Sequence, residues 1–138
     1  IPYSKSSIMN ENKILDYSKR VMEEYDVRPR SPHLMTSNFS GGNQQKLILS
    51  RELNENPKVL LIGQPTRGVD IGAIEFIHQR LIDMRDKGAA ILLVSVELEE
   101  VLSLSDRIVV MFDGNIVGER VNKDVTDREL GLLMAGVA

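Results

Sequence analysis

The residues that most constrain this chain open a predicted helix. The run reads Phe39-Ser40-Gly41-Gly42-Asn43-Gln44-Gln45-Lys46. Ser40 stands where an N-cap belongs, and Pro57 ends the helix predicted for residues 41–55. The first N–H groups of a helix lack intrahelical partners, and the helix dipole is positive there. This helix start therefore suits an anion such as a nucleotide phosphate. The alternative is that Ser40 only caps the helix and the glycines only form the turn.

A second informative segment follows a short apolar run. Val59-Leu60-Leu61-Ile62 is typical of a strand covered on both faces. It leads into Gly63 and then Gln64-Pro65-Thr66-Arg67-Gly68-Val69-Asp70. Nucleotide hydrolysis requires acids at such a strand end, to order Mg²⁺ and to activate water, but the chain has Gly63 and Gln64. Asp70 is predicted to cap the next helix.

The remaining pattern alternates strands and helices. We expect a helix at 11–25, capped by Asn10, and a proline-containing connector at 26–38. Further elements are expected at 71–87 (helix), 89–95 (strand), 97–104 (helix), 108–112 and 115–121 (strand pair) and 127–135 (helix with a capping box). The order strand–helix–strand–helix–strand predicts an α/β fold with a parallel sheet. We divide the chain into a helical unit at 1–56 and part of an α/β core at 57–138.

Composition excludes several classes of function. The 138 residues carry a net charge of −3 without a basic cluster, which argues against nucleic-acid binding. The absence of cysteine excludes disulfides and thiolate metal sites. No apolar run approaches the roughly 20 residues that span a bilayer. No metal site is predicted. The acids Glu97, Glu99 and Glu100 are expected to be solvated at a helix start, where they favour the dipole.

These segments resemble the ATP-binding cassette (ABC) transporter ATPases. The run from Ser40 to Lys46 is similar to the family's signature motif, in the variant of sugar and nucleoside importers. The segment 59–64 lies where the Walker B strand runs, and Arg67-Gly68-Val69-Asp70 resembles the D-loop. Val96 stands where a switch histidine is usual. The resemblance covers nearly the whole chain.

The resemblance is to only part of the family's nucleotide-binding domain. The printed sequence contains no G-x-x-x-x-G-K-[ST] and therefore no P-loop. The resemblance implies that the strand-rich beginning, the P-loop and the Q-loop lie upstream of Ile1. The chain then corresponds to the C-terminal part of the second of two such domains. The implied fold is a partial P-loop NTPase (ABC ATPase) core with a small α-helical subdomain.

The resemblance also implies roles for the two segments. In the family, two domains meet head to tail, and the signature of one covers the ATP held by the P-loop of the other. Ser40 and the Gly42 N–H would bind the γ-phosphate, Gly41 would permit close approach, and Gln44 would reach the ribose or phosphate edge. Asp70 and Arg67 would contact the partner domain. The chain's own site, degenerate at Gly63, Gln64 and Val96, is expected to be catalytically silent.

The parent protein would then be an ATPase subunit of an importer for a simple sugar or nucleoside. ATP and Mg²⁺ are expected in the intact assembly and not in the isolated chain, which is expected to be inactive. Expected partners are a P-loop-bearing domain, a transmembrane permease docked on the region 1–40 and, indirectly, a substrate-binding lipoprotein or periplasmic protein. The location would be cytoplasmic, peripheral on the membrane's inner face.

A non-transport ABC ATPase of repair or translation and a nucleotide-free interaction module are the alternatives. Open apolar strand edges predict self-association of the isolated chain.

Overall fold

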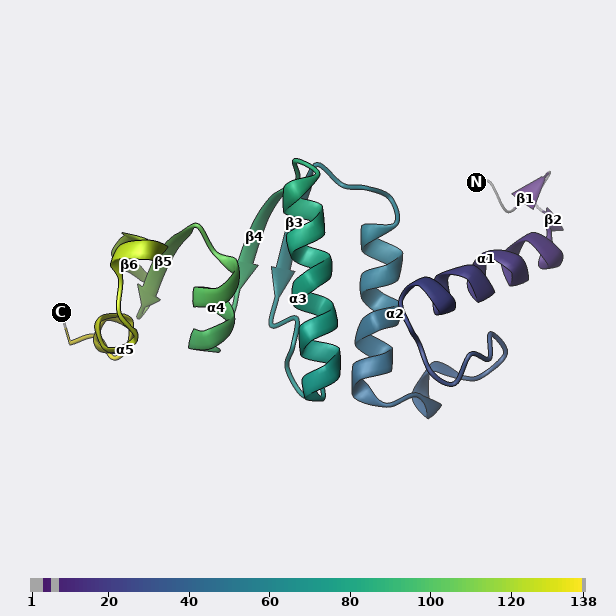
Figure 1. Ribbon diagram of the computed structural model, residues 1–138, viewed down its shortest axis with the longest axis horizontal. Coiled ribbons are helices and arrows are strands. Elements are labelled where there is room, and N and C mark those ends of the chain that lie inside the picture. The colour runs from purple at the N-terminus through teal and green to yellow at the C-terminus, as the bar shows by residue number, and fades with distance from the viewer. Residues whose placement is uncertain (1–3, 6–7, 138) are drawn as a thin grey trace. The chain divides into compact units, whose positions relative to one another are not determined.

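The computed structural model describes residues 4–5 and 8–137 (Figure 1). The chain forms two compact units, which we describe separately. One unit comprises residues 1–58 and 66–88, and the other comprises residues 59–65 and 89–138. The helix at 71–86 is thus grouped with the N-terminal helices. The predicted division between residues 56 and 57 stays a prediction.

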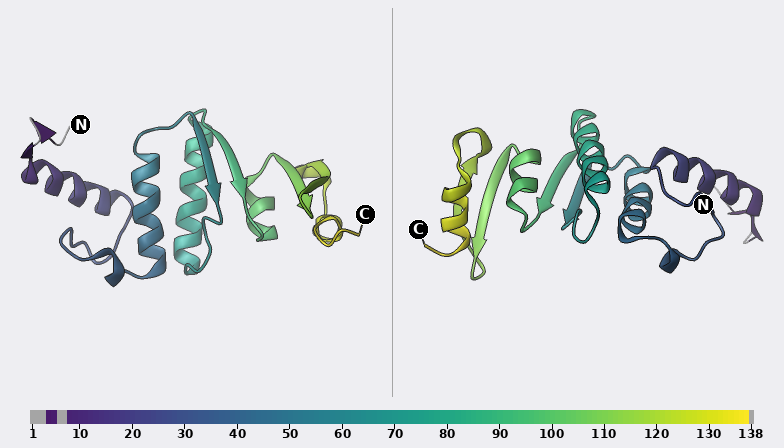
Figure 2. Two further views of the ribbon diagram at one scale, coloured as in Figure 1. Left: turned by 180° about the vertical axis from the view of Figure 1, so that it is seen from behind. Right: turned by 60° about the horizontal axis from the view of Figure 1, so that its bottom comes forward.

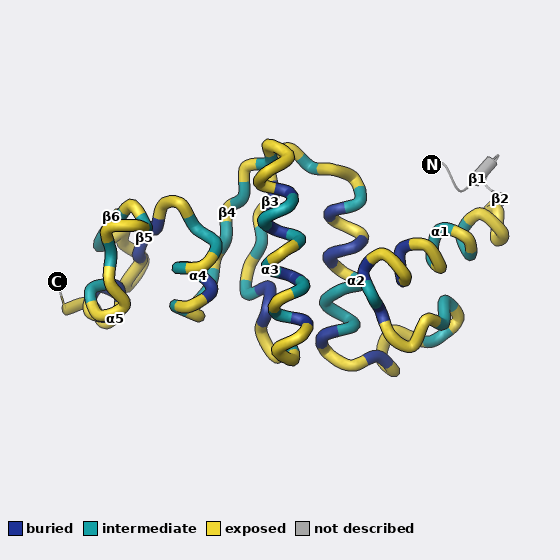
Figure 3. The backbone as a smooth tube through the Cα atoms, in the orientation of Figure 1, coloured by how far each residue is buried: buried dark blue, intermediate teal, exposed yellow. Residues whose placement is uncertain are grey.

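The first unit is mainly helical. A short antiparallel pair, β1 (Ser4–Lys5) and β2 (Ile8–Met9), precedes α1 (Glu11–Glu24). The 3-10 turn η1 (Thr36–Asn38), α2 (Gly41–Leu53) and α3 (Ile71–Asp86) follow. Asn10 caps α1 as predicted, because its Oδ1 accepts the Lys13 N–H at 3.0 Å. Buried residues recur along α2 and α3 (Figure 3), and the core includes Val21, Met22, Tyr25, Val27, Leu49, Leu53, Ala73, Ile77, Leu81 and Met84.

One arginine ties the end of α1 to α3. The Arg80 guanidinium lies 4.7 Å from the centroid of the Tyr25 ring and 5.2 Å from that of Phe76. Its Nη2 also donates to the Glu24 carbonyl oxygen at 2.6 Å. Burial raises the pKa of Tyr25, while the positive charge of Arg80 opposes that rise. The cation–π contacts and the hydrogen bond from Arg80 therefore hold the C-terminal end of α1 against α3.

In residues 59–65 and 89–137, the second unit contains two separate two-stranded sheets. β3 (Val59–Gly63) and β4 (Ala90–Val94) are parallel, with Leu61 opposite Leu92. After α4 (Leu98–Leu104) come β5 (Arg107–Phe112), β6 (Asn115–Val121), the 3-10 turn η2 (Asn122–Asp124) and α5 (Asp127–Met134). The antiparallel hairpin β5–β6 packs against α5 (Figure 2) through Ile108, Val110, Leu130 and Leu133.

One face of the β3–β4 sheet is apolar and exposed. Its side chains belong to Val59, Leu61, Leu92 and Val94, which are 72%, 70%, 60% and 54% exposed. The residues between them, Leu60, Ile62, Ile91 and Leu93, are buried or half-buried. A parallel sheet is normally covered on both faces. The exposed face therefore presents apolar surface that a covering element would bury.

The structure confirms the α/β class and the parallel strand pair, and it corrects two expectations. The third strand of the expected parallel layer is instead half of an antiparallel hairpin, because within residues 4–5 and 8–137 β5 pairs only with β6. Glu100 is not solvated, because it is only 3% exposed, while Glu97 and Glu99 are exposed as expected. The preference of acids for a helix start applied to all three residues, and it could not show which of them would be buried.

Candidate functional site

Ser40 forms the N-cap of α2. Its backbone is extended (φ −61°, ψ 158°), which confirms the predicted cap. Its Oγ accepts a hydrogen bond from Asn43 Nδ2 at 2.8 Å and a long one from Asn43 N at 3.5 Å. Ser40 and Gly41 are exposed, whereas Gly42 is buried. The start of α2 therefore presents a serine hydroxyl and free helix N–H groups at the surface.

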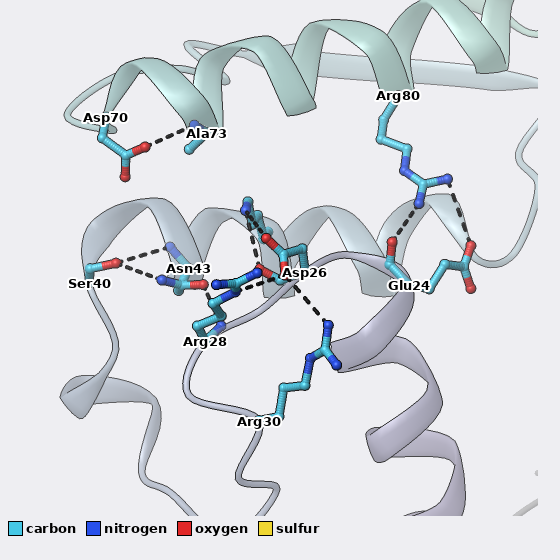
Figure 4. Close-up of polar contacts among 10 residues, drawn as sticks. Glu24, Asp26, Arg28, Arg30, Ser40, Asn43, Asp70, Ala73 and Arg80 are labelled. Atoms are coloured by element: carbon cyan, nitrogen blue, oxygen red, sulfur yellow. Dashed lines mark hydrogen bonds and ion pairs between the residues drawn. The ribbon is translucent and has the colours of Figure 1, made fainter.

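The starts of α2 and α3 lie side by side (Figures 1 and 4). A Cβ at Gly41 would lie 3.1 Å from the Gly68 carbonyl oxygen. A Cβ at Gly42 would lie 2.9 Å from Asp70 Oδ2 and 3.0 Å from Ala73 Cβ. At these distances the Gly68 carbonyl, the Asp70 carboxylate and the Ala73 methyl group would have to shift to admit a methyl group. The glycines thus permit the close approach of the two helix starts.

Asp70 occupies the gap between these helix starts. Its Oδ1 accepts the Ala73 N–H at 2.9 Å, so Asp70 caps α3 as predicted. The positive ends of two helix dipoles meet here, and the Asp70 carboxylate offsets part of that positive potential. Arg67 lies exposed in the preceding turn. Contact of Asp70 and Arg67 with a partner domain stays a prediction.

The close packing at Gly42 makes a stability prediction. Gly42→Ala is expected to destabilise the chain by about 1–3 kcal/mol through overpacking against α3. Gly72→Ala is the matched control: Gly72 is also the second residue after an N-cap, and its Cβ would lie 3.5 Å from Asp70 Oδ1, an ordinary contact. Thermal unfolding of the two variants checks the packing. Equal midpoints for the two would contradict it.

Gln44 points back into its own turn. Its Nε2 donates to the Phe39 carbonyl oxygen at 2.9 Å, and Phe39 is buried. The side chain thereby holds the chain that enters α2. The Gln44 amide retains a second N–H and its oxygen, and its contact with a ribose or phosphate stays a prediction.

Sequence reasoning missed a polar network that joins α2 to the loop after α1 (Figure 4). Asn43 Oδ1 accepts the Arg28 backbone N–H at 2.7 Å. Lys46 Nζ donates to the Asp26 carbonyl oxygen at 3.2 Å, and Arg28 Nε donates to Asp26 Oδ1 at 2.9 Å. Asn43 and Lys46 are three residues apart and so share one helix face. That spacing was visible in the sequence, but the partner loop was not.

Asp26 is the anionic centre of this network. The hydrogen bond from the Arg28 side chain, aided by the charges of Arg28, Lys46 and Arg30, holds the pKa of Asp26 below its usual 3.8. Because the folded-state pKa is depressed, the stabilisation is present above the usual pKa and is lost as pH falls through the folded pKa. An asparagine side chain in place of Asp26 would tolerate the same left-handed backbone, which has φ 46° at this position.

We therefore expect Asp26→Asn to lower the thermal midpoint near neutral pH and to lose that effect as the pH falls through the folded-state pKa of Asp26, which lies below the usual 3.8, because the native carboxylate then becomes protonated. Thermal melts across this pH range measure the difference. Asp113→Asn is the control for loss of one negative charge: Asp113 is exposed in the turn between β5 and β6 and has a similar φ of 45°, so asparagine there is not expected to lower the midpoint. A constant deficit for Asp26→Asn at every pH would contradict the assignment.

The positions expected to be degenerate lie in the second unit. Gly63 ends β3, and Gln64 continues the ladder by donating its N–H to the Val94 carbonyl oxygen at 2.8 Å. Val96 is 64% exposed.

Across residues 4–5 and 8–137, no three His, Asp or Glu side chains gather as a metal-binding group. No helix within these residues has the length and apolarity to cross a bilayer.

Curated relatives match nearly the whole chain. The chain is 50% identical over 135 residues to the nucleoside import ATP-binding protein NupA of Lactococcus lactis subsp. cremoris, a match that covers 98% of this chain and 27% of the relative. It is 47% identical over 135 residues to the guanosine import ATP-binding protein NupO of Bacillus subtilis, a match that covers 98% of this chain and 26% of the relative. The chain thus spans about a quarter of the length of these relatives. No family model matches it.

Solved structures confirm the fold. A dimeric ATP-binding cassette in a post-hydrolysis state, bound to ADP and phosphate, superposes with a TM-score of 0.70 at 23% identity, over 86% of this chain and 51% of that one. A cassette of another ABC transporter superposes with a TM-score of 0.71 at 24% identity, over 94% and 53%. The chain therefore has the fold of part of an ABC ATPase cassette, a partial P-loop NTPase fold. Over nearly its whole length its sequence is similar to the ATP-binding proteins of ABC importers for sugars and nucleosides, which confirms the resemblance.

Proposed function

We propose that this chain belongs to the ATP-hydrolysing subunit of an ABC importer and supplies the signature half of a composite ATP site. The observation that carries the proposal is the start of α2, where an exposed Ser40 hydroxyl and free helix N–H groups meet the positive end of the helix dipole. The importer relatives and the cassette fold support ATP as the anion.

In this proposal the site is completed by a second domain. Ser40 Oγ and the Gly42 N–H bind the γ-phosphate of an ATP held by the P-loop of that domain, in a head-to-tail arrangement. Gly41 is exposed and carries no Cβ, so that the phosphate can approach the backbone. Asp70 and Arg67 contact the second domain beside the phosphate. A structural neighbour was solved as a dimer bound to ADP and phosphate, which supports the pairing of two such domains.

The chain's own ATP site is proposed to be silent. Gly63 offers Mg²⁺ no side-chain ligand. The Gln64 amide cannot accept a proton from the attacking water near neutral pH, and loss of a general base costs about 10²–10⁴ in rate. The Val96 side chain has no group that can donate a hydrogen bond to a phosphate. ATP and Mg²⁺ therefore act productively at the composite site to which Ser40 contributes.

The subunit is proposed to work on the cytoplasmic face of the membrane with a permease, fed by a substrate-binding lipoprotein or periplasmic protein. The region 1–40 would dock on the permease. A nucleoside is the preferred substrate class, because the relatives named for nucleoside and guanosine import are 50% and 47% identical, whereas a relative named for ribose import is 37% identical.

Reconstitution of the complete importer in proteoliposomes tests this function. Labelled guanosine is expected to be taken up in the presence of ATP and to stimulate ATP hydrolysis, and labelled ribose is expected to do so less. A complete importer that hydrolyses ATP but takes up neither solute would contradict the substrate class. If the reconstituted importer does not hydrolyse ATP, the proposed ATPase activity is contradicted.

A further inference from the structure

The side chain of Asn43 determines which hydrogen bonds Ser40 can make. Asn43 lies in the first turn of α2 and is half-buried. It donates twice to Ser40 Oγ, at 2.8 Å from its side-chain Nδ2 and at 3.5 Å from its backbone N. A serine hydroxyl has one proton and two acceptor positions. Because Asn43 uses the oxygen as an acceptor, the Ser40 proton remains to be donated elsewhere.

The orientation of the Asn43 amide follows from its other partner. Its Oδ1 accepts the Arg28 backbone N–H at 2.7 Å, and a backbone N–H can only donate. The reversed amide would set two donors against each other at Arg28, and at Ser40 the hydroxyl would have to donate its proton to the amide oxygen. The Arg28 N–H therefore selects the orientation in which the amide donates to Ser40 (Figure 4).

Arg28 is in turn held in place from α2. Lys46, one turn after Asn43, donates to the Asp26 carbonyl oxygen, and the Asp26 carboxylate accepts from the Arg28 side chain. The loop is thus attached to α2 at Asn43 and again at Lys46. These contacts hold the Arg28 backbone N–H in position, and that N–H orients the Asn43 amide.

We propose that Asn43 is a positioning residue that holds the Ser40 hydroxyl oxygen and leaves its proton to be donated to a phosphate oxygen of ATP. The inference rests on the proposed function. It predicts that Asn43 acts on ATP only through Ser40, so that its substitution has no further effect once the hydroxyl is gone.

Steady-state ATP hydrolysis by the complete ATP-binding protein tests the proposal. Asn43→Ala is expected to lower kcat/KM for ATP about 3–10-fold. Asn43→Asp is expected to lower it further, because the Ser40 hydroxyl would then donate to the new carboxylate and turn from the phosphate. An acid in the first helical turn favours the dipole, so Asn43→Asp should have a thermal midpoint at least equal to that of Asn43→Ala.

A double-mutant cycle separates positioning from other effects. In the Ser40→Ala background, adding Asn43→Ala is expected to leave kcat/KM unchanged. Asn54→Ala is the matched control at the other end of the same helix: the Asn54 Nδ2 donates to Tyr17 Oη at 2.9 Å, so its loss should lower the thermal midpoint without changing kcat/KM.

Two results would overturn the inference while leaving the proposed function intact. One is a strong effect of Ser40→Ala with no effect of Asn43→Ala. The other is an equal fold-loss from Asn43→Ala whether or not the Ser40 hydroxyl is present. Wild-type kcat/KM in Ser40→Ala would overturn the proposed function, and this inference with it.

Discussion

Replacing Ser40 by alanine in the complete ATP-binding protein is expected to lower the rate of ATP hydrolysis roughly 10–100-fold. A hydrogen bond to a charged group is worth about 1.5–3 kcal/mol, and one that strengthens as charge develops in the transition state contributes directly to the rate. The N-terminal dipole of α2 would remain, so some activity should persist. Measurement of kcat at saturating ATP gives the size of the effect.

The cap and the phosphate contact must be separated, because Ser40 also caps α2. Alanine at an N-cap costs about 1 kcal/mol of stability, but glycine costs only a few tenths. Ser40→Gly therefore removes the hydroxyl while it nearly preserves the helix start, and it should lose as much activity as Ser40→Ala. Ser37→Ala, at an exposed serine in η1, is the control and should remain active. Wild-type turnover in Ser40→Gly would refute the hydroxyl's role.

The 138-residue chain on its own is expected to self-associate through the exposed β3–β4 face. Leu61 and Leu92 lie opposite each other in the parallel register and are both largely exposed. Burying a leucine contributes roughly 1.5–3 kcal/mol, so the combined change Leu61→Lys and Leu92→Glu should weaken association by on the order of 10²-fold or more. The opposite charges face each other across the strands, which limits the cost to the sheet.

Sedimentation velocity of the double variant against the native chain measures this effect. Met111→Lys with Ile116→Glu is the matched control, because these residues are also cross-strand partners and are 64% and 68% exposed, but they lie on the hairpin β5–β6. It should associate as the native chain does. A native chain that stays monomeric, or a control that loses association equally, would show that the β3–β4 face is not the contact.

Local sequence was sufficient to predict the helix starts. Asn10, Ser40, Asp70 and Thr126 each accept a hydrogen bond from the backbone N–H three residues later, as capping residues do. Such contacts span a single turn, so residue type and the apolar period were enough to place them. The strands β3 and β4 were predicted from continuous apolar runs for the same reason.

Contacts between distant segments could not be predicted in this way. Arg28 and Asn43 are 15 residues apart, and Arg80 and Glu24 are 56 apart, so no local pattern pairs them. The need for glycine at position 42 also depends on α3, a helix that starts far along the chain. Sequence thus indicated that the start of α2 suits a phosphate, but not which groups orient Ser40.

The most direct test of the central claim is ATP hydrolysis in a mixture. The 138-residue chain is combined with an ATP-binding cassette that has an intact P-loop and Walker B acids but carries alanine in place of its own signature serine. Neither component should hydrolyse ATP alone, and the mixture should hydrolyse ATP only when the chain has Ser40. Hydrolysis by the chain alone, or a mixture whose activity is the same with Ser40→Ala, would contradict the account.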